Sequence, residues 1–403
     1  MLSLFLARKL RLQGSFTTAI LRLAVAAIGL SVAVMLASVC IVRGFRHEIR
    51  SKVTGFASHV QISTARENDT YETIPIVCDE LLLDSLSKLP GVAAAQPYAY
   101  KPGIIKTKEA LEGIVLKGLS PRHSLKFFAE NMVAGKLPNL ALDSIPNKDL
   151  LLSQTTASRM GLSTGSKVNI YFAGERLKAR PFIVCGIYET GLEEFDKTFA
   201  LCQLGHINKL NNWLPDEASG VELLLDDPEQ TEVITENIHT NLPPELSAKS
   251  MYELYPQIFE WLALVDSNVY ILLALMSGVA IISIITALIV LLIERTPMVG
   301  LLKSLGASNS LIRRVFMALG GRLVLGGLFW GNLFGLAICF LQREYHFISL
   351  DQSSYYMRFV PVSIQWPDVL TINLGCFVVC YLFLIIPAAV IGRVSPLSAI
   401  KFR

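Results

Sequence analysis

The sequence has few charged residues and lacks the motifs on which covalent catalysis commonly depends. Charged residues make up 17% of the chain against a hydrophobic share of 52%. The mean hydropathy is +0.48. There is no Walker A sequence, no nucleophile elbow and no group of triad candidates, and the six histidines show no metal-ligand spacing. We therefore expect a protein that is not an enzyme and has no metal or cofactor of its own. The net charge of +3 gives no footprint for nucleic-acid binding.

Cysteines are too few and too irregularly spaced for a disulfide framework. Four of the seven lie within apolar runs, where they serve as small apolar residues: Cys40, Cys339, Cys376 and Cys380. The other three, Cys78, Cys185 and Cys202, lie in the more polar middle of the chain. This odd number is compatible with one disulfide, and spacing does not identify the pair.

The apolar residues are concentrated in four long runs. These are Leu23–Val42, Val269–Ile293, Val315–Leu341 and Val369–Ile391. A bilayer core of about 30 Å requires roughly 20 apolar residues in a helix, so each run predicts a transmembrane helix. The first run is too long for a signal-peptide core and no small-residue cleavage site follows it, which favours a retained anchor.

Basic residues in the short flanks predict the orientation. They are concentrated before the first run, between the second and third, and after the fourth, which places both termini in the cytoplasm. Four basic residues just outside the first run oppose this pattern, Arg43, Arg46, Arg50 and Lys52, but long translocated domains are largely exempt from the rule. The predicted order is then as follows: an amphipathic N-terminus at 1–18, a helix at 19–43, an external domain at 44–267, a helix at 268–293, a cytoplasmic loop at 294–312, a helix at 313–341, an external loop at 342–367, a helix at 368–392 and a cytoplasmic tail at 393–403.

The external domain contains two similar β-α-β patterns. The first has a helix at 79–89 followed by strands at 92–100, 103–107 and 113–117. The second has a strand at 221–225, a helix at 229–242 and a strand at 246–249. We predict one α/β layer formed by 44–120 and 220–267, although a chance likeness of two amphipathic helices is the alternative. The segment 121–219 is a predicted β-rich insertion, with strands at 167–172 and 182–188 and a short helix at 155–160. Within it, Glu193, Glu194 and Asp196 are expected to form a solvated loop.

The cytoplasmic loop carries a short helix signal. After Glu294 and Arg295, Thr296 is a good N-cap and Pro297 suits the first helical position. Four apolar residues then follow at helical spacing: Met298, Leu301, Leu302 and Leu305. Gly306 is placed where a positive φ ends a helix, and Ser308 can cap the next one. The apolar stripe fits either a helix that rests on lipid headgroups or a helix that docks into a groove on a cytosolic partner.

Two further features belong to the membrane helices. Gly327, Gly331 and Gly335 recur every four residues on one helix face, a spacing that lets two helix backbones approach closely. The packing partner is another helix of this chain or of a second copy. Pro387 is expected to kink the last helix.

The loop sequence resembles that of a known family. Residues 294–308, ERTPMVGLLKSLGAS, are similar to the signature of ABC permeases of the lipoprotein-releasing, FtsX and MacB superfamily. Further segments resemble the lipoprotein-releasing (LolC/LolE) permeases: Gly44-Phe45, His59–Ile62, Leu151–Gln154, Leu162–Val168 and Gly186–Gly191. Thr296-Pro297-Met298 departs from the more polar run of the family, which leaves the individual docking contacts open.

The resemblance implies a working context for the chain. Such permeases act as dimers, with a second copy or a paralogue, and bind a cytosolic ATPase that holds ATP and Mg²⁺. The loop helix would be the coupling helix, with Glu294, Arg295, Pro297, Met298, Leu301, Leu302, Leu305 and Gly306 in the ATPase contact. The α/β layer would be the porter and the insertion the sabre. The implied function is extraction of lipoproteins from the bacterial inner membrane and their transfer to a periplasmic chaperone.

Two other functions compete with this one. An FtsX-like permease would regulate a periplasmic cell-wall hydrolase without moving substrate. MacB-like export support is disfavoured, because only about 20 residues precede the first helix where MacB carries its ATPase domain.

Overall fold

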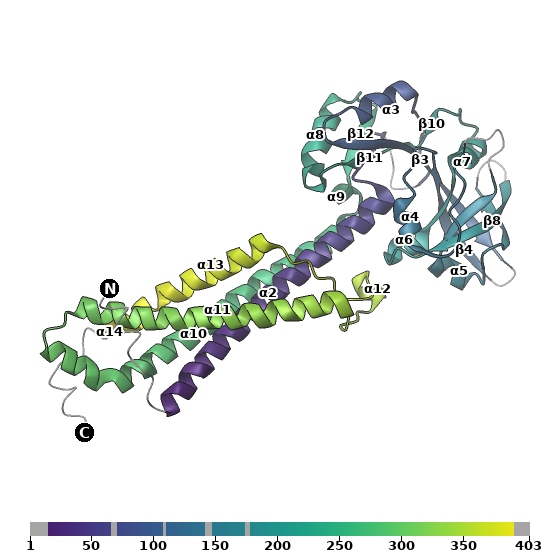
Figure 1. Cartoon of the computed structure of the whole chain (residues 1–403). Coiled ribbons are helices and arrows are strands. Elements are labelled where there is room, and N and C mark those ends of the chain that lie inside the picture. The colour runs from purple at the N-terminus through teal and green to yellow at the C-terminus, as the bar shows by residue number, and fades with distance from the viewer. Residues whose placement is uncertain (1–14, 66–70, 108–109, 142–146, 174–177, 391–403) are drawn as a thin grey trace. The chain divides into compact units, whose positions relative to one another are not determined.

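The computed structural model describes residues 15–65, 71–107, 110–141, 147–173 and 178–390 (Figure 1). Residues 1–14 of the predicted N-terminus and the whole predicted tail, 393–403, lie outside these ranges. The chain forms two compact units. One contains residues up to 47, 260–349 and 359 onward, and the other contains 48–259 and 350–358.

The first unit is built from long apolar helices. They are α2 (Ser15–Ala57), α10 (Pro256–Ser304), α11 (Asn309–Tyr345), α13 (Trp366–Phe383) and α14 (Ile385–Val390). Among the described residues, four stretches are long and apolar enough to cross a membrane: Thr18–Ala57, Pro256–Ser304, Asn309–Tyr345 and Trp366–Ala389. The four predicted spans are therefore confirmed. Their shared core includes Ile28, Val32, Ile284 and Val324, each fully buried.

The helix bounds differ from the predicted ones at two places. The first helix does not end near residue 43 but continues to Ala57, since Gly44 is followed by Phe45, Ile49 and Val53, which keep a buried apolar stripe. The last span is interrupted between α13 and α14 at Leu384. Pro387 explains this break, because its ring would clash with the carbonyl of Phe383, where α13 ends.

The predicted separate helix in the cytoplasmic loop is wrong in one respect. Helix α10 runs without a break through Thr296 and Pro297 to Ser304. Thr296 is no N-cap: its hydroxyl donates to the Leu292 carbonyl at 2.9 Å inside the helix. Pro297 removes one backbone hydrogen bond from the helix. Val299 is 1% exposed in the core shared by the long helices, and its burial holds the following turn in place. The other two expectations are confirmed, since Gly306 has φ +88° and Ser308 caps α11 at the Leu311 amide.

The second unit begins with a four-stranded α/β layer. Strands β1 (Val60–Thr64), β3 (Val92–Lys106), β11 (Gly220–Leu225) and β12 (Leu246–Ser250) are ordered β12-β1-β11-β3, with every neighbouring pair antiparallel. Helices α3 (Glu80–Ser87) and α8 (Thr231–Asn241) share one core with these strands. The two predicted β-α-β halves are thus present, and they interleave, because β11 of the second half lies between β1 and β3 of the first.

The remaining large strands close into a barrel. They are β4 (Leu111–Leu119), β6 (Asp149–Ser153), β7 (Lys167–Phe172), β8 (Lys178–Tyr188) and β9 (Phe199–Gln203). Pairing runs from β3 through β4, β9, β6, β8 and β7 back to β3, which makes a closed circuit of six strands. The barrel core therefore includes residues of β3 and β4 as well as of the insertion, so no core boundary falls at residue 120. The two predicted strands at 92–100 and 103–107 are the single strand β3, which bends through Pro102-Gly103 to serve both layers.

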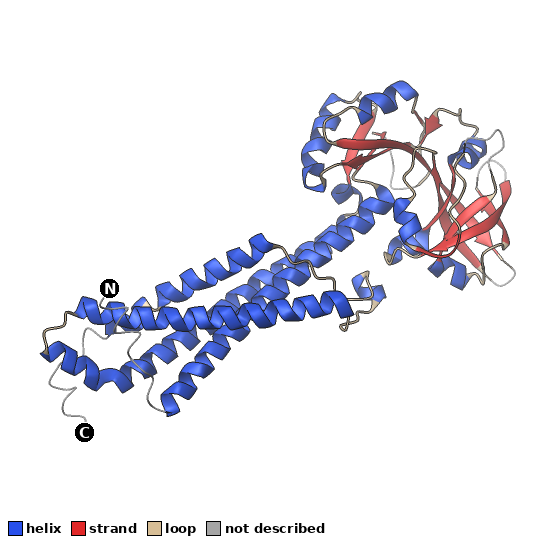
Figure 2. Cartoon of the chain, in the orientation of Figure 1, coloured by secondary structure: helices blue, strands red, loops and turns tan. Residues whose placement is uncertain are grey.

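Short elements complete this unit (Figure 2). They are β2 (Ile76–Val77), α4 (Lys126–Glu130), β5 (Met132–Gly135), α5 (Gln154–Arg159), α6 (Glu193–Thr198), α7 (Leu204–Asn211), β10 (Glu217–Ala218), η1 (Pro228–Gln230), α9 (Met251–Leu254) and α12 (Gln352–Tyr355). The predicted solvated acidic loop is wrong for Asp196. It lies in α6, 3% exposed, and its carboxylate accepts hydrogen bonds from Thr190 and the Gly191 amide.

Candidate functional site

The end of α10 presents apolar side chains that no other described residue covers. Leu301 and Leu305 are 60% and 76% exposed. Met298 and Leu302 are half-buried, so the predicted stripe divides into an inner and an outer pair. Lys303, two residues from each exposed leucine, lies on the other side of the helix, and Gly306 ends the turn. Exposed leucines at a helix terminus suit a protein groove, whereas the lipid-facing leucines of the spans lie among apolar neighbours.

The start of this segment contains an unusual carboxylate. Glu294 is half-buried, and its Oε2 atom is enclosed without a hydrogen-bond partner among the described residues. Arg295 and Pro297 lie on the same helix, where Pro297 removes one backbone donor. The eight predicted coupling residues therefore occupy one continuous helix end and the turn that closes it.

The glycines of α11 face α2. A Cβ at Gly331 would lie 2.6 Å from Val32 Cβ, and one at Gly335 would lie 2.9 Å from Ala33 Cα. Gly327 faces Ile28 in the same way, and Gly29 of α2 faces the backbone of Gly327 and Gly331 on α11. The first and third spans therefore cross with their backbones in near contact, which leaves no room for any larger residue at the crossing.

Two arginine–aspartate pairs lie where the spans end opposite to Gly306. Arg43 forms a two-pronged contact with Asp368, at 3.0 and 3.1 Å, and Arg46 pairs with Asp266. These four side chains line a pocket of about 280 Å³. In the sequence, Arg43 and Arg46 stand out only as exceptions to the charge rule. Acidic partners more than 200 residues away in the chain could not be assigned from spacing.

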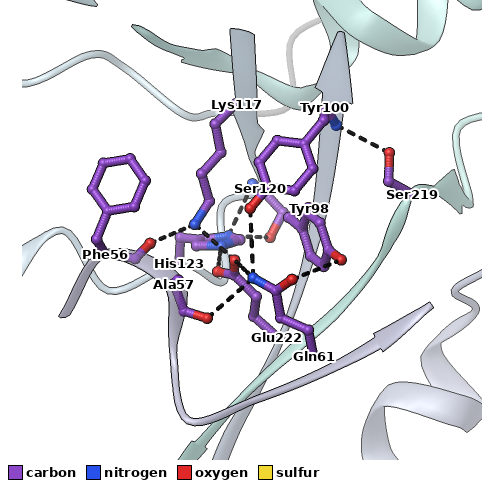
Figure 3. Close-up of polar contacts among 10 residues, drawn as sticks. All are labelled: Phe56, Ala57, Gln61, Tyr98, Tyr100, Lys117, Ser120, His123, Ser219 and Glu222. Atoms are coloured by element: carbon purple, nitrogen blue, oxygen red, sulfur yellow. Dashed lines mark hydrogen bonds and ion pairs between the residues drawn. The ribbon is translucent and has the colours of Figure 1, made fainter. Parts of the chain in front are cut away.

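A buried polar network lies in the second unit, around the last turn of α2 (Figure 3). Lys117 on β4 donates to Glu222 on β11 at 2.7 Å and to the Phe56 carbonyl at 2.5 Å. Its ammonium also lies 5.0 Å from the centre of the Phe56 ring. The side chains of Lys117 and Glu222 are each 1% exposed.

Further side chains extend this network (Figure 3). His123 Nε2 lies 3.3 Å from the second oxygen of Glu222, and Ser120 donates to His123 Nδ1. Gln61 on β1 donates to Glu222 at 3.0 Å and to the Ala57 carbonyl at 3.2 Å. The hydroxyl of Tyr98 on β3 donates to Gln61 Oε1. The Glu222 carboxylate thus joins β11 to β1 and β4, and through Gln61 and Lys117 it is connected with the end of α2.

The charges of this network are set by burial and by contact. Burial lowers the pKa of Lys117, and the Glu222 carboxylate opposes that effect. Burial by itself would raise the pKa of Glu222, but Lys117 and His123 outweigh it and hold this pKa below its usual value. Burial also lowers the pKa of His123, which keeps its ring neutral near pH 7. The result is a buried ion pair whose carboxylate also accepts hydrogen bonds from neutral donors.

A segment between the third and fourth spans belongs to the second unit. Residues 350–358 are attached through Glu189, which accepts from Gln352 at 2.9 Å and from Arg358 at 2.5 Å. Lys52 of α2 donates to the Tyr356 carbonyl at 3.0 Å. The predicted external loop at 342–367 is therefore partly a structural component of the domain. No sequence motif marks these contacts.

Comparison with known proteins covers almost the whole chain. Residues 22–240 match the family described as the MacB-like periplasmic core domain, and residues 270–396 match the FtsX-like permease C-terminal family. The lipoprotein-releasing system transmembrane protein LolC of Neisseria meningitidis is 24% identical over 97% of this chain and 96% of its own. LolE of Haemophilus influenzae is 22% identical over 93% and 92%. The solved periplasmic region of MacB from Actinobacillus actinomycetemcomitans aligns with 51% of this chain and 95% of its own, at 13% identity and a TM-score of 0.35.

Together, the two family matches cover residues of both units. The MacB-like match ends within α8, and the FtsX-like match covers the last three spans together with the exposed end of α10. More than half of the chain falls in the first of them. The chain therefore belongs to the MacB-like periplasmic core domain family and is an ABC transporter permease of the LolC/LolE type.

Proposed function

We propose that this permease subunit extracts lipoproteins from the inner membrane and passes them to a periplasmic carrier. A separate cytosolic ATPase, which binds ATP and Mg²⁺, supplies the energy. The proposal rests on relatives named for lipoprotein release that match almost the full chain. Extraction also requires an energy source on physical grounds, because each CH₂ drawn out of the membrane costs about 0.8 kcal/mol.

The structural feature that carries the proposal is the exposed end of α10. In the proposed mechanism both termini and Gly306 lie in the cytoplasm, and Leu301 and Leu305 insert into a groove of the ATPase. Two permease subunits, copies or paralogues, face each other, with lipoprotein bound between them. Closure of the ATPases then moves α10 and α11, which the turn at Gly306 joins. The tight crossing of α11 with α2 at the glycines passes this motion to the first span.

The docking step is tested by adding one negative charge at three neighbouring positions. Leu301→Asp and Leu305→Asp place a carboxylate in the proposed groove, while Ser304→Asp adds the same charge at an exposed polar position of the same helix. We expect both leucine variants to lose at least tenfold in ATPase affinity and the serine variant to change little. Co-purification of the ATPase and ATP hydrolysis by the complex measure this. Equal behaviour of all three variants would remove the docking assignment.

The cargo requires a separate test, because an FtsX-like permease that regulates a cell-wall hydrolase is the alternative function, and residues 270–396 match the FtsX-like permease C-terminal family. The complex is purified in mild detergent from cells with radiolabelled lipoproteins. Co-purifying lipoprotein, released on addition of ATP, supports extraction. A co-purifying hydrolase without lipoprotein, together with normal lipoprotein sorting in a deletion strain, would establish the regulatory function instead.

A further inference from the structure

One side of the α2–α11 crossing is an open apolar groove. Its volume is about 920 Å³, within the range of ligand pockets. The described residues that line it all come from these two helices: Thr18, Leu21, Arg22, Val25, Ala26, Gly29, Leu30, Ala33, Leu323, Trp330, Phe334 and Ile338. Trp330 and Phe334 form one wall as a stacked pair, with ring centres 5.8 Å apart. The glycines create the groove, because they draw the helix axes together and leave the flanking large side chains to form its rims.

The groove has the length of one membrane leaflet. Arg22 and Ala33 are eleven residues apart on α2, which corresponds to about 16 Å at 1.5 Å per residue. Half of a 30 Å hydrocarbon core is about 15 Å. An extended acyl chain that starts at the level of Arg22 would therefore reach the middle of the bilayer beside Ala33 and Ile338.

A cation lies at the end of the groove that is nearer the N-terminus of α2. Of the described residues that line the groove, Arg22 alone is charged, and it is exposed. No acidic residue occurs in the sequence before Glu48, and none occurs between Asn309 and Gln342. Neither helix that builds the groove therefore brings a carboxylate to Arg22. An anion at headgroup level, joined to an apolar chain, complements both parts of the surface.

We propose that this groove binds an anionic phospholipid, with its phosphate at Arg22 and one acyl chain along Trp330 and Phe334. The lipid belongs to the leaflet on the side of the helix N-terminus, and it fills the space beside the glycine crossing. The site is independent of the cargo route, so it holds for a lipoprotein-extracting and for a regulatory permease alike.

Trp330 gives a direct signal for the test. The full chain is purified in detergent and titrated with phosphatidylglycerol that carries brominated acyl chains, which quench a tryptophan on contact. The quenching due to Trp330 is the difference between the wild type and Trp330→Phe. We expect saturable quenching by the phosphatidylglycerol at lower concentration than by brominated phosphatidylcholine.

Two substitutions separate the charge from the groove. Arg22→Gln should weaken the phosphatidylglycerol signal about fivefold, the effect of one basic residue near an anionic surface, and should abolish the preference over phosphatidylcholine. Arg314→Gln removes an equal charge from an exposed position of α11 outside the groove and should change neither. Ala26→Phe, which fills the groove, should reduce quenching by both lipids.

Other occupants predict different results. If both lipids quench equally and Arg22→Gln does not change the quenching, the groove binds lipid nonspecifically and the proposal is overturned. Relief of the quenching by one equivalent of acylated lipoprotein would assign the groove to cargo and overturn it. Absence of quenching, with disulfide cross-linking of Leu30→Cys between two chains, would assign the groove to a second copy and also overturn it.

Discussion

The buried ion pair between Lys117 and Glu222 yields the sharpest test of how the second unit is held together. Replacing Lys117 with Met keeps an unbranched side chain that is one heavy atom shorter and removes its charge. Glu222 then remains 1% exposed, with hydrogen bonds from Gln61 and His123 but without a cation at 2.7 Å. Removal of one partner of a buried pair costs about 3–5 kcal/mol, because the remaining charge stays buried without compensation.

The loss should depend on pH in a defined direction. In the wild type Lys117 holds the pKa of Glu222 below its usual value. In Lys117→Met, burial acts on Glu222 with less opposition and raises this pKa in the folded state. A raised carboxyl pKa means that the folded state binds more protons than the unfolded state, so stability falls as the pH rises. The deficit relative to wild type should therefore be larger at pH 8 than at pH 5.

A double-mutant cycle supplies the magnitude. Glu222→Gln keeps the shape of the side chain, and the combination Lys117→Met/Glu222→Gln removes both charges together. We expect the double variant to be at least about 2 kcal/mol more stable than the sum of the single losses predicts.

Urea unfolding of the full chain in detergent provides the measurement. Trp213 packs against the barrel core and reports on the second unit, whereas the other three tryptophans lie on α10, α11 and α13. Additive single losses, or a Lys117→Met deficit that does not change with pH, would refute the charge argument.

Two further predictions concern the helix crossing and a second buried histidine. Gly331→Ala should lower the melting temperature of the detergent-solubilised chain, because its Cβ would lie 2.6 Å from Val32 Cβ. A Cβ at Gly278 would have no atom within 4 Å, so Gly278→Ala should leave the melting temperature unchanged or raise it. Equal shifts in the two variants would contradict the packing argument. Burial and then Arg50 lower the pKa of His59 to about 4 from 6.5, so its ring is neutral in the folded state and stability should fall as the pH falls below 6.5. Between pH 7 and 5 the loss attributable to His59 is about 2 kcal/mol. Hydrogen exchange of β1 and β11, corrected for intrinsic rates, should show a weaker pH dependence in His59→Gln, and an unchanged dependence would contradict the assignment.

Membrane helices were predicted well because their signal is local. A run of about 20 apolar residues has no other stable location than a bilayer, so Val269–Ile293 needs no knowledge of its neighbours to be read as a span. The turn at Gly306 and the cap at Ser308 are local for the same reason, since each is decided by the conformation of one or two residues. The N-cap assigned to Thr296 failed because a proline next to a threonine also fits inside a long helix, and burial of Val299 decided between the two.

The extracytoplasmic unit shows the limits of sequence reading. Periodicity found the two β-α-β patterns, and it could not show that β11 inserts between β1 and β3 or that β7 closes a barrel against β3. Strand pairing joins residues more than 60 positions apart, such as Ile104 and Tyr171, and leaves no periodic mark.

The sequence by itself determined the four spans, the turn at Gly306 and the family, because each depends on residues that are adjacent or at fixed helical spacing. The tertiary structure decided which charges meet and which faces stay open. Arg43 and Arg46 acquire Asp368 and Asp266 as partners, and Lys117 becomes buried beside Glu222. Within the described ranges, Leu301 and Leu305 stay exposed and the groove beside Trp330 stays open. These outcomes depend on contacts between distant segments, whose energies exist only once the chain has folded.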